Sequence, residues 1–213
     1  MKVGTKSILF GAHCFLVHPW FVAAAWWKLN GFPWNPRLWI AFLVHDLGYI
    51  GKPNMDGPEG ETHVELGARI MHWLFDGDVI VCGQVLRRDT TWYEFCLYHS
   101  RFYAKRDGRK PSLLCMADKL ALALTPAWLY LPMVRATGEI DEYMALAKVR
   151  NLVVADVESK YAYLNLTVRS QELWYAAVQE YVYRWVMEHK DGREDKWTPS
   201  PKGSVDEIYT PTK

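Results

Sequence analysis

The chain has 213 residues, half of them hydrophobic, and its 25 basic and 24 acidic side chains leave a formal net charge of +1. This length suits one domain with a full hydrophobic core. We expect that domain over residues 1–190, followed by a polar C-terminal tail over residues 191–213. The balanced charge gives no strong signal for nucleic acid and no general attraction to an anionic membrane. Any recognition by charge must therefore be local.

The N-terminal segment from Ile8 to Trp27 carries no charged residue, as a signal peptide or a membrane span does. It also contains His13, His18 and Pro19, and imidazole is poorly suited to lipid. We therefore expect a buried core segment, with a membrane span as the alternative. The cysteines lie far apart and form no C-x-x-C pair, which indicates reduced thiols in the cytoplasm. They are Cys14, Cys82, Cys96 and Cys115.

Helix-starting and helix-ending residues divide the first part of the chain. Pro19 suits the first position of a helix that runs to about residue 29, and it leaves His18 at a break just before that helix. The Asn35-Pro36 pair starts the next helix as a cap and a first-position proline. That helix delivers the adjacent His45-Asp46 pair near its C-terminal end, before a loop rich in Gly and Pro.

Further helices are predicted in the rest of the chain. Thr91 and Glu94 have the spacing of a capping box, which starts a helix that reaches about residue 103. Apolar spacing and stop signals predict further helices over residues 61–75, 112–125, 139–150 and 167–189. The last is amphipathic, with inward side chains expected at Trp174, Ala177, Val178, Tyr181 and Trp185. No segment alternates with the period of a strand, so we expect an all-α fold.

Helical spacing separates buried histidines from surface histidines. His63 shares one helix face with apolar residues three, seven and eleven positions further on, so we expect it to be buried. The same test places His99 on an apolar stripe, whereas His72 lies among charged residues and is expected on the surface. Asp118 lies in an apolar helix, where a carboxylate needs a metal, a hydrogen-bond network or a salt bridge, for example with Lys119.

A single buried histidine or aspartate is more often a hydrogen-bonded core residue than a metal ligand. We therefore interpret His13 as a core residue and His189, at a helix C-terminus, as a partner of the helix dipole. Six other residues form an ordered set on an apolar background, where an unpaired ionisable group is costly and one or two cations would satisfy all of them. They are His18, His45, Asp46, His63, His99 and Asp118.

This ordered set resembles the HD-domain superfamily of metal-dependent phosphohydrolases, named for an adjacent His-Asp pair. The resemblance covers about residues 18–124 and implies a compact helical bundle, here with an additional C-terminal helix. The segment HDLGYIGKPNMDGPEGETHVELGARI is similar to the HD-GYP branch, and CMADKLALAL resembles the helix of the family's last aspartate. The resemblance implies one metal site at His18, His45, Asp46 and Asp118, and a second at His63, His99 and a bridging Asp46.

The chain departs from the HD-GYP branch at several positions. Tyr49 stands where that branch has a lysine after the His-Asp-x-Gly run, and a lysine appears only at Lys52. The branch's paired histidines followed by glutamate are replaced by Tyr98, His99 and Ser100, and its Gly-Tyr-Pro element is missing from the sequence. Cyclic di-GMP hydrolysis is therefore not implied.

The resemblance implies hydrolysis of a nucleotide or another small phosphorylated metabolite by a metal-activated hydroxide. His45 and Asp46 would form the catalytic centre with two divalent ions, for which the ligand set favours iron or manganese, with magnesium, cobalt, nickel and zinc as alternatives. Residues 87–110 hold seven basic side chains against three acidic ones, a local excess that suits a phosphate. The candidate substrate contacts are Tyr49, Lys52, Arg101, Lys105 and Lys119.

Two other functions are compatible with the same sequence. Four histidines and two aspartates are also the ligand composition of the mixed-valent di-iron oxygenases of this superfamily, such as myo-inositol oxygenase. A non-catalytic binding module, with structural metals and a partner docked on the tail or on exposed aromatic residues, is the third hypothesis. A homo-oligomer is compatible with each of these functions.

Overall fold

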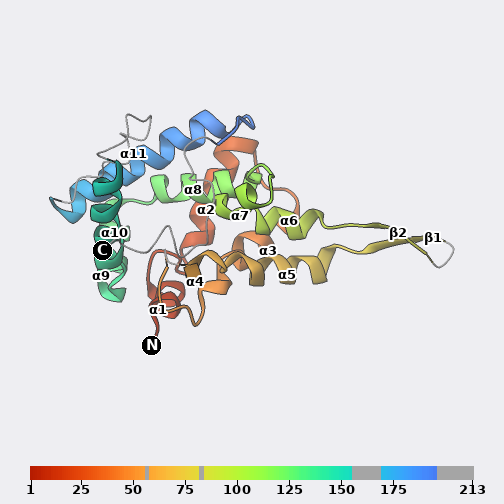
Figure 1. The fold of residues 1–213 in the computed structure, drawn as a ribbon, viewed down its shortest axis with the longest axis horizontal. Coiled ribbons are helices and arrows are strands. Elements are labelled where there is room, and N and C mark those ends of the chain that lie inside the picture. The colour runs from red at the N-terminus through yellow and green to blue at the C-terminus, as the bar shows by residue number, and fades with distance from the viewer. Residues whose placement is uncertain (56–57, 82–83, 155–168, 196–213) are drawn as a thin grey trace.

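The computed structural model describes residues 1–55, 58–81, 84–154 and 169–195, and within them almost all of the regular structure is helical (Figure 1). The prediction of an all-α fold is confirmed, with one short hairpin as an addition to it. The helices are short and frequently interrupted. Several chain turns therefore lie inside the molecule, close to the core.

The first part of the fold consists of short helices whose starts and ends follow from the sequence. Pro19 lies in the first turn of α2, and Gly31 ends that helix with a φ angle of 84°, which favours glycine. The Asn35 side chain accepts a hydrogen bond from the Arg37 N–H at 3.0 Å and so caps α3, as predicted. The elements are α1 (Val3–Phe10), α2 (His18–Asn30), α3 (Pro36–Val44), the 3-10 helix η1 (Leu47–Tyr49), α4 (Pro58–Glu61) and α5 (Val64–Phe75).

A two-stranded hairpin follows α5 and projects away from the helices (Figure 1). Its strands are β1 (Asp78–Val81) and β2 (Gln84–Arg88), paired antiparallel with Asp78 opposite Arg88 and a register irregularity after Val79. This hairpin was not predicted from the sequence. The β-branched residues of the segment DVIV favour a strand, but four residues are too few to show a periodic pattern.

The second part of the fold contains predicted helices and one over residues 127–137 that was not predicted. The helix expected over residues 91–103 is broken, because the Ser100 side chain accepts a hydrogen bond from the Tyr103 N–H at 3.3 Å and caps a new helix. This break places His99 between two helices. The elements are α6 (Thr91–Leu97), α7 (Arg101–Arg106), α8 (Leu113–Leu124), α9 (Ala127–Thr137), α10 (Glu139–Val154) and α11 (Gln171–His189).

The start of α6 also differs from the prediction. The N-cap is Thr90, and the predicted capping box at Thr91 is wrong by one residue. The main caps come instead from Asp76, at the end of α5. Its carboxylate is fully buried and accepts hydrogen bonds from the backbone N–H groups of Trp92 and Tyr93 at 2.9 and 2.8 Å. Asp76 thereby joins α5 to α6 across the base of the hairpin.

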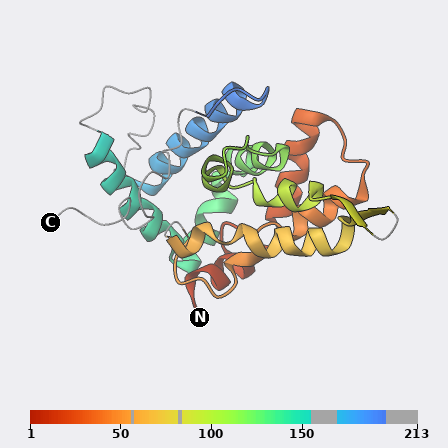
Figure 2. The same cartoon turned by 45° about the vertical axis from the view of Figure 1, so that its right-hand side comes forward.

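Helix α8 lies at the centre of the fold, between α2 on one side and α11 on the other (Figures 1 and 2). It buries Leu114, Ala117, Leu120 and Ala121 completely. The expected inward face of α11 is confirmed at Trp174, Val178, Tyr181 and Trp185, whereas Ala177 is only partly buried. This arrangement holds the middle of α8 rigidly inside the core.

The charge-free N-terminal stretch is divided between α1 and α2 and does not form one continuous helix. Among the described residues, no single helix is both long and apolar enough to cross a membrane. The pair α8 and α9 meets the length and composition test only when taken together, and it is bent by 99°.

The first residues of the expected C-terminal tail contact the helices. Asp195 accepts a hydrogen bond from the Trp185 indole N–H at 3.2 Å, and its backbone carbonyl accepts one from the Lys105 ammonium at 3.1 Å. His189 is buried, and its Nδ1 donates to the Trp185 carbonyl at 2.6 Å in the last turn of α11. Residues 196–213 lie outside the described residues, so the tail over 191–213 stays a prediction.

We expect the substitution Asp76→Ala to destabilise the protein by about 1–2 kcal/mol, because two backbone N–H groups at the start of α6 lose their acceptor. Urea unfolding followed by circular dichroism measures the change. Glu180→Ala is the control, since Glu180 forms an exposed pair with Arg184 and the loss of that pair should cost less than about 0.5 kcal/mol. Equal free energies of unfolding for the two variants would contradict this capping role.

Candidate metal centre

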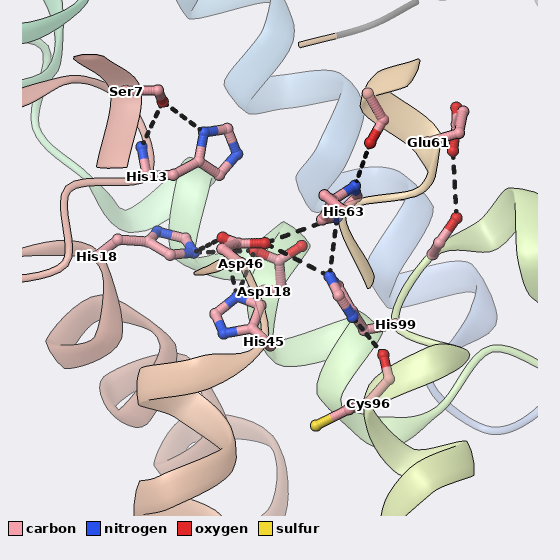
Figure 3. A network of polar contacts seen from close by, with 12 residues as sticks. Ser7, His13, His18, His45, Asp46, Glu61, His63, Cys96, His99 and Asp118 are labelled. Carbon is pink, nitrogen blue, oxygen red and sulfur yellow. Dashed lines mark hydrogen bonds and ion pairs between the residues drawn. The ribbon is translucent and has the colours of Figure 1, made fainter. Parts of the chain in front are cut away.

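The structure brings all six predicted metal ligands together at one buried place (Figure 3). Each of them is 9% exposed or less. Asp118 projects from the middle of the central helix α8, and the other five stand where helices begin, end or break. These five are His18 at the start of α2, His45 and Asp46 between α3 and η1, His63 just before α5, and His99 between α6 and α7.

The first group of ligands consists of two imidazoles and two carboxylates. The Nε2 atom of His18 lies 3.0 Å from Asp118 Oδ1 and 3.4 Å from Asp46 Oδ2. The Nε2 atom of His45 lies 3.1 Å from Asp46 Oδ2 and 3.8 Å from Asp118 Oδ1. The four residues each offer one donor atom within 4.8 Å of the others, a spacing that could surround a metal ion.

The second group shares Asp46 with the first. The Nε2 atoms of His63 and His99 lie 3.7 and 3.5 Å from Asp46 Oδ1, and 3.2 Å from each other. Asp46 therefore turns its Oδ2 atom to the first group and its Oδ1 atom to the second (Figure 3). A carboxylate in this position could bridge two ions.

Backbone carbonyls orient three of the four histidines. Each of these imidazoles uses Nδ1 to donate to the carbonyl three residues earlier in the chain. Because a carbonyl oxygen only accepts, Nδ1 must carry a proton, which leaves Nε2 as the ring atom that can bind a metal. The bonds are His45 to Phe42 at 3.0 Å, His63 to Gly60 at 2.7 Å and His99 to Cys96 at 2.5 Å.

Two atoms at the centre support the presence of a cation. Among the described residues, His45 Nε2 and Asp46 Oδ2 are buried without a hydrogen-bonding partner of suitable geometry. A positive group between them, either a proton on Nε2 or a metal ion, would satisfy both. Imidazole nitrogen and carboxylate oxygen are together the ligands of first-row transition metals. The donor set therefore fits metal ions.

Two glycines allow the second group to approach the first. A Cβ atom on Gly48 would lie 1.8 Å from the His63 carbonyl oxygen, and a Cβ atom on Gly67 would lie 2.6 Å from the Val44 carbonyl oxygen. Neither distance is possible between non-bonded atoms, so any side chain here would push α5 and the preceding loop away from α3. The lack of a side chain at both positions is what lets His63 reach Asp46.

The burial of His63 is confirmed, but the helix face used to predict it is wrong. Leu66 and Leu74 are 37% and 41% exposed. The expected helix over residues 61–75 is interrupted before Val64, so His63 belongs to a turn and is buried by that turn's packing on η1. His72 is exposed, as predicted. The buried face of α5 consists of Val64, Gly67, Ala68 and Met71.

The surrounding charges shift the pKa values of the ligands in opposite directions. Burial alone lowers the pKa of His45, but Asp46 and Asp118 outweigh it and raise this pKa to about 10. Burial would raise the pKa of each aspartate, but the positive neighbours outweigh it and hold both pKa values well below the usual range. Burial holds the pKa of His63 well below its usual value. In the metal-free protein, a proton on His45 therefore supplies the positive charge that a metal ion would supply.

Asp118 has both kinds of contact expected from its sequence position, one to the histidine cluster and one to Lys119. Its Oδ1 atom faces His18, as a ligand would, and its Oδ2 atom accepts a hydrogen bond from the Lys119 ammonium at 3.0 Å. Burial lowers the pKa of Lys119, but Asp118 outweighs burial and raises it above its usual value. Lys119 is thus a fixed positive charge beside the first group.

A cavity of about 230 Å³ opens onto His18 and Asp118. Of the five candidate substrate contacts, Tyr49, Arg101 and Lys119 line it. Lys52 and Lys105 do not. The Lys52 ammonium contacts the Thr62 hydroxyl, and the Lys105 ammonium contacts the Asp195 carbonyl.

His13 lies at this cavity and not in the core. Its side chain is partly buried, its Nδ1 atom is 3.0 Å from the Ser7 hydroxyl, and its ring is 5.7 Å from that of His18. Burial is the main cause that lowers its pKa to about 4. The signal for His13 in the sequence is that it lies in the same charge-free stretch as His18. An apolar background surrounds residues of a cavity wall and residues of the core alike, so it could not distinguish the two positions.

Comparison of this chain with family models, curated proteins and solved structures finds no significant match. The interpretation of the centre therefore depends on its own donor atoms, their spacing and the cavity beside them. These features establish a buried histidine and aspartate cluster that could hold metal ions.

We expect Asp46→Ala to lose all tightly bound metal, because its carboxylate faces both groups of ligands. In contrast, His63→Ala should keep the ion of the first group. Elemental analysis of the purified proteins after gel filtration measures the metal content. His72→Ala, which changes an exposed histidine, is the control and should keep the wild-type content. A wild-type metal content in Asp46→Ala would contradict this assignment.

We also expect metal binding to release protons and to strengthen as the pH rises from 6.5 to 8.5. The pKa of His45 is raised to about 10, so His45 is protonated throughout this range and a metal has to displace that proton. Affinity should rise by up to about tenfold per pH unit for each displaced proton. Calorimetric titration with Mn²⁺ in buffers of different ionisation enthalpy counts the protons. Binding without proton release would contradict the protonated state of His45.

Proposed function

We propose that this protein is a metal-dependent phosphohydrolase of the HD type, which cleaves a phosphate ester of a nucleotide or another small phosphorylated metabolite. The observation that carries the proposal is the position of Asp46. One of its oxygens faces each of two histidine-containing groups, and a cavity with fixed positive charges opens beside the first group. A two-metal hydrolase needs both features, one for the ions and one for the substrate.

The order of the ligands along the chain supports the HD assignment. Histidine, His-Asp, histidine, histidine and aspartate occur in the order of the superfamily, and all six converge in space. Gly48 and Gly67, which the close approach of the two groups requires, lie in the segment HDLGYIGKPNMDGPEGETHVELGARI. The two glycines of this segment are therefore explained by close packing in this chain, independently of the resemblance.

The residues around the cavity would prepare a phosphate ester for hydrolysis. Two divalent ions held by the six ligands would supply a hydroxide near neutral pH and stabilise the charge on the phosphoryl group. Lys119 and Arg101 line the cavity next to this centre and would attract and orient the phosphate. Both keep a raised pKa, because nearby acceptors outweigh the effect of burial, so both stay positive at neutral pH.

A di-iron oxygenase is the second candidate function. It is favoured by the donor set, since four imidazoles and two carboxylates all converge here, which is the composition of the oxygenases named above. The two candidates differ in a measurable way. An oxygenase consumes dioxygen and requires iron, whereas a phosphohydrolase releases phosphate without dioxygen and accepts several divalent ions.

We expect phosphate release from a panel of nucleotides and sugar phosphates in the presence of Mn²⁺, Fe²⁺, Co²⁺ or Mg²⁺. The Asp46→Ala variant should lose at least about a thousandfold in kcat/KM, because both ligand groups lose their shared carboxylate. His72→Ala is the matched control and should keep its activity. Undiminished hydrolysis by Asp46→Ala would exclude the proposal. Dioxygen uptake with iron, without phosphate release, would establish the oxygenase instead.

A further inference from the structure

The cavity beside the first ligand group has two chemically different ends. At one end lie His18, Asp118 and the positive side chains of Lys119 and Arg101. The remaining lining is mostly aromatic and aliphatic, with His13 and Thr125 as further polar residues, and its walls include η1, α8, α9, α10 and α11. The aromatic side chains among these walls are Tyr49, Tyr130, Tyr143, Trp174 and Tyr181.

One wall of this cavity carries an unsatisfied hydrogen-bond donor. Trp174 is 4% exposed, and its indole Nε1 is buried with no hydrogen-bonding partner among the described residues. An indole N–H can only donate, and buried donors are rarely left unpaired in folded proteins. Trp174 lines the cavity, so a ligand in the cavity could supply the missing acceptor.

The aromatic walls favour a flat ligand. The rings of Tyr143 and Trp174 lie almost parallel, at 13°, with their centres 5.9 Å apart. Tyr49 is held parallel to the His63 ring, at 6° and 4.0 Å, so its orientation is fixed by a metal ligand. These stacks hold the rings in fixed orientations in the cavity wall, and a planar group packs on a fixed ring better than a branched aliphatic group does.

The positive end of the cavity is held as firmly as the aromatic end. The Arg101 guanidinium lies 4.8 Å from the centre of the Trp185 ring and donates to the Tyr181 hydroxyl at 3.1 Å. Lys119 is held by Asp118 at 3.0 Å. An anionic group would therefore meet two positioned cations at the end of the cavity that opens onto the metal ligands.

The size of the cavity limits what can enter it. About 230 Å³ is smaller than the roughly 300–1,000 Å³ of typical sites for drug-sized ligands. The space suits one planar ring system on a small linker such as a sugar, while the phosphate extends toward the ligands. A polymer or a molecule with two planar ring systems would exceed this space.

We propose that this cavity is a ring-binding pocket, which selects phosphate monoesters whose alcohol part carries a planar ring with a hydrogen-bond acceptor, and that Trp174 is its specificity-determining residue. The ring would pack between the aromatic walls and accept a hydrogen bond from Trp174 Nε1, with the phosphate toward Lys119 and Arg101. This proposal rests on the proposed function for the orientation of the phosphate. The binding of the ring can be tested without any hydrolysis.

The experiment compares matched ligands that differ only in the ring. The methylene phosphonate analogues of uridine and adenosine 5′-monophosphate contain a P–C bond that is not hydrolysed, and the same analogue of ribose 5-phosphate lacks the base. Isothermal titration calorimetry on the wild-type protein with Mn²⁺ measures the three dissociation constants. We expect at least one base-containing analogue to bind about 50-fold more tightly than the ribose analogue.

Two variants assign the effect to the indole N–H. Trp174→Phe keeps an aromatic wall and removes the donor, so it should weaken binding of the base-containing analogue about fivefold to tenfold and leave the ribose analogue unchanged. Trp128→Phe on α9 is the control, because Trp128 is 76% exposed, and it should change neither value. Unfolding in urea verifies that both variants are folded.

The possible results separate this proposal from the proposed function. Equal binding of all three analogues, or an equal loss for all of them in Trp174→Phe, would overturn the ring-binding pocket. In that case phosphate release that depends on Asp46 would still support the phosphohydrolase. Selective binding of the base-containing analogues without phosphate release from any substrate would support the pocket and overturn the hydrolytic function.

Discussion

The burial of one shared carboxylate is the constraint on which this fold depends. Asp46 is 6% exposed, and a buried ion without partners costs several kcal/mol. Both of its oxygens must therefore meet positive or donating groups, and these come from segments far apart in the sequence. The start of α2 places His18 on one side, and the turns before α5 and α7 place His63 and His99 on the other. The hydrophobic core has to hold all of these segments around one point.

Short, interrupted helices meet this demand better than long helices would. The last carbonyl groups of a helix have no partner inside the helix and must find a donor elsewhere. Three ligand histidines supply these donors, since His45, His63 and His99 each donate Nδ1 to a carbonyl in the last turn of the helix that precedes them. The same bond satisfies the helix end and fixes the tautomer of the ligand. The breaks between α4 and α5 and between α6 and α7 thus position His63 and His99 in the cluster.

The sequence predicted which residues form this cluster better than it predicted how they are arranged. The six residues of the buried cluster, the helical fold, the first-turn proline Pro19 and the Asn35 cap could be predicted, because each depends on local chemistry or on apolar background. The break before His99 and the capping of α6 by Asp76 could not, because both depend on contacts between segments that only the folded chain brings together. For the same reason, helical spacing predicted correctly that His63 is buried but assigned its burial to the wrong face of the helix.

The turn between α6 and α7 joins the metal ligands to the cavity wall. Only Ser100 separates His99, in the second ligand group, from Arg101, at the positive end of the cavity. The Ser100 hydroxyl donates to the Glu61 carboxylate at 3.3 Å, which ties this turn to the segment just before His63. Arg101 in the cavity wall and His99 in the second group therefore belong to one short turn that is anchored at Glu61. A ligand that displaced Arg101 would act on the same turn that positions His99.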